Sequence, residues 1–128
     1  MRQLVSSGSP FEPVIGFSRA LKVGDRVLVS GTAPVWADGS CDPDPGVQTK
    51  RCLEIIVEAL REAGADESDV VRTRMYLTNA ADWASIGRAH GEFFAAVRPA
   101  STMVVVNALL DPRWKIEMEA EAVVERSE

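Results

Sequence analysis

The stretch Ile116-Glu117-Met118-Glu119-Ala120-Glu121-Ala122-Val123-Val124 decides how this chain folds. Its apolar and acidic residues alternate from Ile116 to Ala122. Successive side chains of a β-strand point to opposite faces of a sheet, so this alternation is typical of a strand with one buried face. It predicts a strand over residues 115–125 that turns its apolar face to a core and its glutamates to the other side.

A second strand, over residues 70–78, alternates in the same way. One of its faces is largely apolar, and the opposite face carries Arg72, Arg74 and Tyr76. If the two strands share a sheet, the arginines and the glutamates lie on the same side of it and pair across strands. Each exposed pair of this kind contributes about 0 to 1 kcal/mol.

Two helices accompany these strands. Apolar residues at helical spacing predict one helix over residues 47–63 and another over residues 82–97, the second ended by Pro99. Gly87 and Gly91 inside the second helix each cost about 1 kcal/mol relative to alanine. Glycines at such positions indicate close packing or a ligand beside the helix.

Further strands are predicted over residues 2–5, 18–22, 26–30 and 102–109, which gives the order β-β-β-α-β-α-β-β. With 128 residues, 46% of them hydrophobic, the chain fits a single domain over residues 1–128. Helices that alternate with half-buried strands predict an α+β fold, a two-layer sandwich with both helices on one face of the sheet.

The run Met103-Val104-Val105-Val106 is apolar on both faces of its strand. A strand without a polar side has to be covered on both faces, and two helices on one face of the sheet leave the other face bare. We therefore expect the chain to associate with itself through the sheet.

The composition argues against several partners. The formal charge is −5 and no basic cluster is present, so nucleic acid is a poor partner. The N-terminus lacks the apolar run of a signal peptide, and no stretch reaches the roughly 18 apolar residues of a membrane span. We expect a cytoplasmic protein with no membrane partner.

No metal or cofactor is indicated either. One histidine and two separated cysteines do not supply the closely spaced ligands of a zinc site. The acidic loop 38–46 contains two prolines and lacks the spacing of a calcium loop, so it is interpreted as a turn. Cys41 and Cys52 leave a disulfide open, although a lone pair in a cytosolic chain is usually reduced.

Four ordered segments carry a resemblance to a known family: Gly16-Phe17-Ser18-Arg19-Ala20, residues 24–34, residues 70–78, and residues 94–120. Together they are similar to the Rid family of reactive-intermediate deaminases, also called the YjgF family, over nearly the whole domain. The resemblance implies a chorismate-mutase-like fold, a mostly antiparallel six-stranded sheet with two helices on one face. It also implies homotrimers with a central β-barrel, ligand clefts between subunits, and hydrolysis of imines and enamines.

The chain departs from the family pattern at Pro99-Ala100-Ser101-Thr102. Family members have an arginine where Ser101 stands, and that arginine binds the carboxylate of an imino acid through a charged fork. Arg98 occupies a different position and is interpreted as a charge that complements the dipole at the helix C-terminus. The chain is therefore predicted to be a divergent member that lacks the substrate-binding arginine.

Other positions complete the predicted site. Glu117 aligns with the family glutamate that places or activates the hydrolytic water; the alternative is that it belongs to a solvated or ion-paired acidic face. Phe17 keeps the ring of a family tyrosine without its hydroxyl. Ser30 and Gly31 retain a strand-ending turn where a glycine lets backbone N–H groups approach a ligand.

On the second helix, Gly87 and His90 stand where the family carries asparagine and tyrosine. His90 is either a pocket side chain or a core histidine with a satisfied ring, and the spacing favours the core. Arg74 and Trp114 are candidates that could rebuild a different pocket, although most single residues of these types are structural.

These residues predict a cofactor-independent, deaminase-like hydrolase of a small imine, enamine or related metabolite, with specificity altered away from simple 2-imino acids. The alternative is a non-enzymatic homotrimer that binds a small-molecule ligand in the same cleft. A nuclease role, sometimes attached to the family, is disfavoured because an acidic chain repels RNA.

Overall fold

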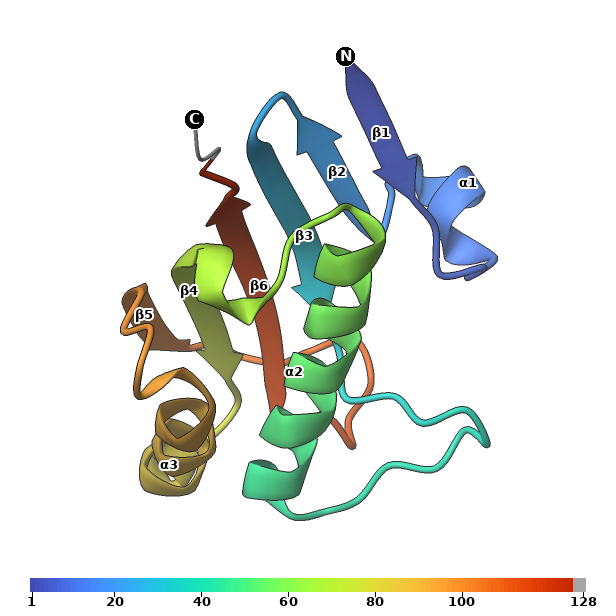
Figure 1. Cartoon of the computed structure of the whole chain (residues 1–128). Coiled ribbons are helices and arrows are strands. Elements are labelled where there is room, and N and C mark those ends of the chain that lie inside the picture. The colour runs from blue at the N-terminus through green and yellow to red at the C-terminus, as the bar shows by residue number, and fades with distance from the viewer. Residues whose placement is uncertain (126–128) are drawn as a thin grey trace.

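The computed structural model describes residues 1–125 of the chain. Its sheet has the strand order β1-β2-β3-β6-β4-β5, and two helices lie against one face of it (Figure 1), so the α+β prediction is confirmed. The strands are β1 Arg2–Val5, β2 Ala20–Val23, β3 Arg26–Thr32, β4 Val70–Leu77, β5 Ala100–Val105 and β6 Ile116–Val123. The helices are α1 Phe11–Ile15, α2 Pro45–Glu62 and α3 Trp83–Phe94, with short 3-10 segments η1 Glu67–Asp69 and η2 Ala80–Asp82.

Strand β6 lies in the middle of the sheet. It pairs antiparallel with β3 on one side and with β4 on the other, whereas β5 runs parallel to β4. The apolar residues of β6 are at most 2% exposed, as the alternation predicted: Ile116, Met118, Ala120 and Ala122. The glutamates between them lie on the opposite face and are half-buried.

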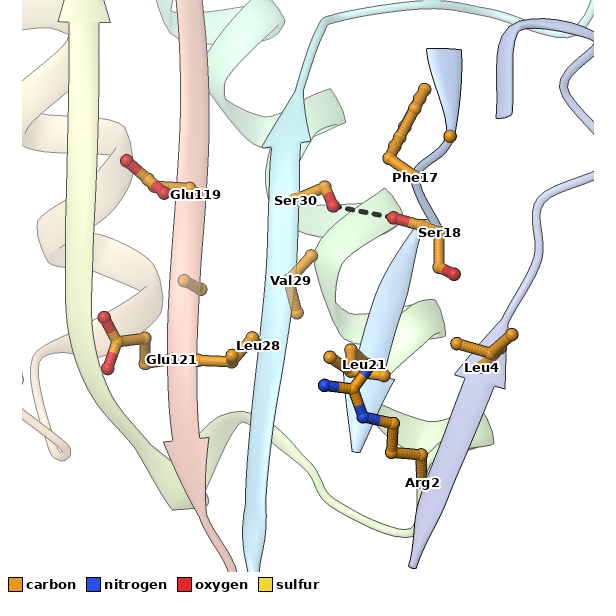
Figure 2. Close-up of a pocket in the computed structure, with 12 residues that line it drawn as sticks. Arg2, Leu4, Phe17, Ser18, Leu21, Leu28, Val29, Ser30, Glu119 and Glu121 are labelled. Carbon is orange, nitrogen blue, oxygen red and sulfur yellow. Dashed lines mark hydrogen bonds between the residues drawn. The ribbon is translucent and has the colours of Figure 1, made fainter. Parts of the chain in front are cut away.

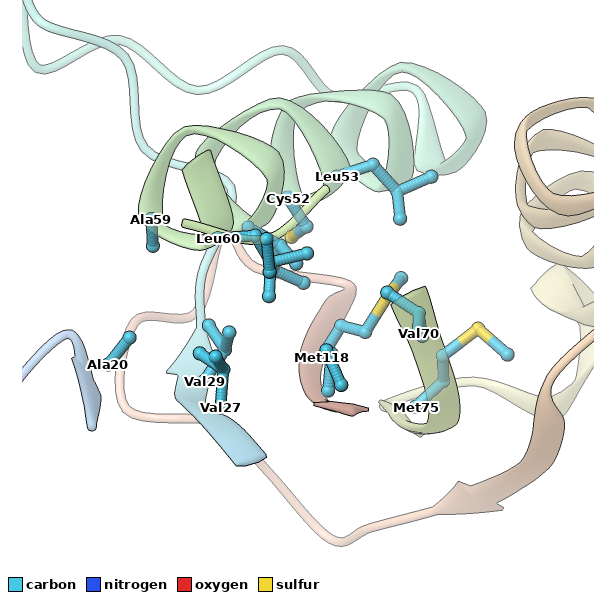
Figure 3. Close-up of a cluster of buried hydrophobic side chains, with 14 of the residues drawn as sticks. Ala20, Val27, Val29, Cys52, Leu53, Ala59, Leu60, Val70, Met75 and Met118 are labelled. Carbon is cyan, nitrogen blue, oxygen red and sulfur yellow. The ribbon is translucent and has the colours of Figure 1, made fainter. Parts of the chain in front are cut away.

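The core lies between α2 and the sheet (Figure 3). Cys52, Leu53 and Leu60 project from α2 toward Val29 and Met118 of the middle strands, and all five are at most 3% exposed. Fully burying a side chain such as leucine contributes about 1.5 to 3 kcal/mol relative to leaving it exposed. This contact therefore holds α2 to one face of the sheet and leaves the other face without a helix.

Helix α2 begins at Pro45, before the predicted start at residue 47, because Asp44 caps it. The Asp44 side chain accepts the backbone N–H groups of Gly46 and Val47. A proline in the first turn has no N–H that would need a partner, so it is well placed there.

The ends of α3 and β5 also differ from the prediction. Helix α3 ends at Phe94 rather than at residue 97, and the chain then turns through Arg98, whose φ is 54° and whose N–H donates to the Phe94 carbonyl. Strand β5 spans residues 100–105 rather than 102–109. It ends at Val105 because its partner β4 ends at Leu77, the residue opposite.

The short helix α1 was not predicted, because five residues are too few to show a helical period. Its Glu12 is 6% exposed and accepts hydrogen bonds from the hydroxyls of Ser6 and Ser7 and from the Ser7 backbone N–H. These bonds, the Ser7 hydroxyl first, lower the pKa of the Glu12 carboxyl. Glu12 thereby holds the segment between β1 and β2 in place.

The face of the sheet opposite α2 and α3 is called the open face here; it carries Leu28, Arg74, Tyr76, Val104 and the β6 glutamates. Figure 2 shows part of this face, with helix ribbons behind the strands. Leu28 and Val104 are 38% and 42% exposed on it. Among residues 1–125, no helix combines the length and the apolar character needed to cross a bilayer.

Replacing Glu12 by glutamine should lower the free energy of unfolding at neutral pH by about 1.5 to 3 kcal/mol, the range for hydrogen bonds to a charged group. The folded-state pKa of Glu12 lies below the unfolded value. Its contribution is therefore present above the unfolded pKa, about 4.3, and is lost as the pH falls through the folded pKa. Urea unfolding of both proteins from neutral to acidic pH measures this difference, which should shrink at the acidic end.

The control is Glu58→Gln, which changes an exposed glutamate of α2 in the same chemical way. It should leave the free energy of unfolding nearly unchanged. An equal loss in the two variants, or a difference that persists at acidic pH, would contradict the role given to Glu12.

Candidate functional site

Glu117 lies on the open face, beside a break in the pairing of β3. The register between β3 and β6 shifts between Val29 and Thr32, and this irregularity sets Gly31 against the Glu117 carboxylate. A methyl group on Gly31 would lie 2.5 Å from Glu117 Oε2. The missing side chain at position 31 therefore leaves the space that the carboxylate occupies.

Arg19 is the cation of this site, and sequence reasoning did not single it out. Its Nη2 donates to the Gly31 carbonyl oxygen, and its guanidinium carbon lies 5.9 Å from the centre of the Phe17 ring. The Arg19 Nε atom is buried and has no hydrogen-bond partner among residues 1–125. The one signal for Arg19 in the sequence was its place two residues after Phe17, inside a segment that carries the family resemblance.

Burial raises the pKa of the Glu117 carboxyl. The nearby charge of Arg19 opposes this shift, and the charge of Glu119 adds to it. Burial lowers the pKa of the Arg19 guanidinium, while the charges of Glu12 and Glu117 oppose that shift. A half-buried carboxylate with a raised pKa takes up a proton more readily than an ordinary glutamate, which suits a general base.

A hollow of about 480 Å³ lies on the open face (Figure 2), and Glu117, Arg19 and Gly31 are not among the residues that line it. Phe17 and Ser30, two of the predicted site residues, line it, together with Glu119 and Glu121 of β6. The Ser30 hydroxyl donates to the Ser18 carbonyl at 2.6 Å, which holds the end of β3 to the segment before β2. The wall of the hollow carries three leucines and the cation Arg2 on the β1–β3 side, and it is acidic on the β6 side.

Arg74 lies on the same face but is engaged in an ion pair. Its Nη1 is 3.2 Å from Glu121 Oε1, and Arg26 Nη2 is 3.2 Å from Glu121 Oε2. The Tyr76 hydroxyl donates to the Glu119 carboxylate, and this bond raises the pKa of Tyr76. The predicted pairing of arginines and glutamates across the strands is thus confirmed.

Ser101, His90 and Gly87 lie on the other side of the sheet, between β4, β5 and α3. Thr73 Oγ1 is 2.8 Å from Ser101 Oγ and 2.8 Å from His90 Nε2. The nearest atom to a methyl group built on Gly87 is Met103 Cε of β5, at 3.9 Å. The sheet therefore separates these residues from Glu117 within one chain.

The structure places the remaining predicted residue elsewhere. Trp114 lies in the connection before β6, and its indole N–H is buried with no partner among residues 1–125. It does not line the hollow that holds Phe17 and Ser30.

The described residues contain no group of three or more histidine, cysteine or acidic side chains placed to hold a metal ion. Cys41 and Cys52 are both free thiols. Burial raises the pKa of the Cys52 thiol, which donates to the Thr32 carbonyl from within the core.

Fold and site together define a class of protein: an α+β sandwich with one uncovered sheet face, on which a half-buried carboxylate lies beside a glycine at an irregularity in the strand pairing. The family model described as Endoribonuclease L-PSP matches residues 8–124. The chain belongs to this family, which is also called the YjgF, RutC or Rid family.

Relatives cover most of the chain. An uncharacterised protein of Streptomyces coelicolor is 43% identical over 119 residues, which cover 92% of this chain and 89% of that protein. The Arabidopsis thaliana protein named Reactive Intermediate Deaminase A, chloroplastic, is 31% identical over 110 residues, which cover 84% of this chain and 58% of that protein. The crystal structure of a YjgF/YER057c/UK114 family member from Mycobacterium tuberculosis has 42% identity and a TM-score of 0.89, and the match covers 97% of this chain and 100% of that one.

Replacing Gly31 by alanine should push the Glu117 carboxylate away from β3 toward solvent, because the added methyl group overlaps Oε2. Since burial raises the pKa of Glu117, greater exposure should lower it. Carbon NMR titration of the glutamate carboxyls measures this pKa. The melting temperature should change little, because the flexible end of the Glu117 side chain moves at low cost.

Gly91→Ala is the control for this titration, since a methyl group there meets nothing within 4 Å. It should leave the Glu117 pKa where it is. A pKa that Gly31→Ala does not move would show that Gly31 does not set the depth of the carboxylate.

Proposed function

We propose that the protein is a cofactor-independent cytoplasmic hydrolase that adds water to a small imine or enamine and releases ammonia. The observation that carries the proposal is the half-buried carboxylate of Glu117, whose pKa is raised by burial and which lies against Gly31 with the charge of Arg19 nearby. The name of the Arabidopsis relative, Reactive Intermediate Deaminase A, supports deamination as the reaction.

The reaction proceeds in two steps that Glu117 serves in turn. A water oxygen bonds to the carbon of the C=N group while Glu117 takes one proton from the water and passes it to the substrate nitrogen, which gives a carbinolamine. Glu117 then takes the hydroxyl proton of the carbinolamine and passes it to the nitrogen as the C–N bond breaks, so that a carbonyl compound and ammonia are formed. The charge of Arg19 offsets part of the effect of burial and so favours the ionised carboxylate that begins the cycle.

A cleft between copies of the chain would reunite the residues that the sheet separates. On the edge strand β5, Val104 and Val105 are 42% and 54% exposed, and β5 is the last strand of the sheet. An apolar edge of this kind favours association. In the proposed homotrimer, Glu117 and Arg19 of one copy face Ser101 of the next copy across the cleft.

Replacing Glu117 by glutamine should lower kcat/KM for imine hydrolysis by about 100- to 10,000-fold, the effect of removing a general base. The assay generates imines in place from amino acids or amines with an oxidase and follows ammonia release above the uncatalysed rate. The glutamine keeps the size of the side chain, so the fold and the assembly should be preserved.

Glu58→Gln again serves as the control and should retain the wild-type rate. Light scattering should give a trimer mass for the wild type and for both variants. Full activity of the Glu117 variant, or a monomeric wild-type protein, would refute the proposed site.

Introducing the family cation should restore action on simple imino acids. Ser101→Arg should raise kcat/KM for 2-iminobutanoate by about 10- to 100-fold, because a bidentate charged contact to a carboxylate is worth a few kcal/mol. Ser101→Gln, which is long but uncharged, is the matched control and should give little gain. Rapid hydrolysis of 2-iminobutanoate by the wild type would contradict the importance given to position 101.

A metabolite-binding homotrimer without turnover is the second candidate, and the loss of the cation at Ser101 favours it. A ligand that binds the folded state raises the melting temperature as its concentration rises. Saturable shifts without any ammonia release above background would support binding alone. RNA is not proposed as a ligand, because the net charge is −5.

A further inference from the structure

A chain of hydrogen-bonded side chains runs from the interior to the surface beside the edge strand β5. Ser101 Oγ and His90 Nε2 each lie 2.8 Å from Thr73 Oγ1. Thr73 is fully buried, His90 is half-buried with its ring centre 4.7 Å from that of Phe94, and Ser101 is exposed. This hydrogen-bonded series therefore ends at the Ser101 hydroxyl, which a ligand can reach.

The His90 ring at one end of this hydrogen-bonded series is uncharged at neutral pH. Burial alone lowers the pKa of His90, and no charged side chain of residues 1–125 contributes to the shift, so the ring is neutral at neutral pH. A carboxylate bound at Ser101 would give up part of its hydration, and the series of side chains from Ser101 to His90 offers it no cation in return. An uncharged polar group has less hydration to lose.

The Thr73 hydroxyl has one proton, so it donates to one neighbour and accepts from the other. If it donates to Ser101, the ring N–H of His90 donates to Thr73, and the Ser101 hydroxyl is free to donate to a ligand. If it donates to His90, the Ser101 hydroxyl donates to Thr73 and accepts from a ligand. A carboxamide offers both a carbonyl oxygen and an N–H, so it fits either arrangement.

One flank of α3 beside His90 carries two glycines, Gly87, which is partly buried, and Gly91, which is exposed. A methyl group on Gly87 would make an ordinary contact with Met103, and one on Gly91 would meet nothing within 4 Å. Neither glycine has a positive φ. Close packing within the chain therefore does not require these glycines, each of which costs the helix about 1 kcal/mol. The two glycines leave the flank of α3 beside His90 free of side chains, so that a ligand can approach it.

We propose that Ser101, positioned by Thr73 and His90, is a specificity-determining residue that selects a carboxamide at the place where the family arginine would hold a carboxylate. The substrate class is then an imine or enamine with a carboxamide next to the C=N carbon. The identity of the reaction rests on the proposed function, whereas the preference for the carboxamide is a property of binding alone.

The test compares pyruvamide with pyruvate, which differ in this group and lack the C=N bond. Calorimetric titration of the wild type should give a dissociation constant about tenfold lower for pyruvamide, the effect of about one hydrogen bond. Ser101→Ala and Thr73→Val should each bring the ratio of the two constants close to one. Gly87→Ala should raise the melting temperature, as expected for a helix, and weaken the binding of pyruvamide.

Thr49→Val is the matched control for Thr73→Val. Thr49 is equally buried, and its hydroxyl donates to the Pro45 carbonyl within α2. The Thr49→Val variant should lose about as much stability as Thr73→Val and should keep the preference for pyruvamide. A wild type that prefers pyruvate or saturates with neither ligand, or a preference that survives both Ser101→Ala and Thr73→Val, would overturn the inference. A preference for pyruvamide without hydrolysis of any imine supports the inference and refutes the hydrolase.

Discussion

The packing of α2 on one face of the sheet is the constraint on which the rest of the structure depends. It buries every second residue of β6 and leaves the residues between them uncovered, so one strand supplies both the core and the acidic face. Glu117 lies between Ile116 and Met118, which are both fully buried. The backbone that carries the carboxylate therefore cannot shift without disturbing a densely packed interior, and Glu117 is held at a set depth beside Gly31.

The parts of the fold that follow from local pattern were predictable from the sequence. The alternation in β4 and β6 gave the two faces of the sheet and the pairing of Arg74 with Glu121, because the period of two is a property of each strand by itself. The end of β5 at Val105 is set by the end of its partner β4, which no local pattern reveals. Helix α1 likewise depends on hydrogen bonds from two serines to Glu12.

The candidate site was likewise predictable only in part. Glu117, Phe17 and Gly31 were expected from the family resemblance, and the structure brings all three to the surroundings of Arg19. Arg19 itself was missed, because its role depends on the carbonyl of Gly31 at an irregularity in the sheet. The sequence singled out Ser101 only because family members have an arginine at that position. Its bond to Thr73 arises from the parallel register of β4 and β5, which the sequence does not display.

The net charge of the protein favours one charge state of the proposed substrate. On the open face Glu121 is paired with Arg26 and Arg74, and Glu117 lies near the charge of Arg19, whereas the hydrogen-bonded series that ends at Ser101 is uncharged. A protonated imine that carries a carboxamide has a net positive charge, while a protonated 2-imino acid is neutral overall. A chain with a net charge of −5 attracts the first more strongly than the second. In the proposed function, a serine in place of an arginine at position 101 would weaken the binding of a carboxylate and would also spare a cationic substrate the repulsion of that arginine.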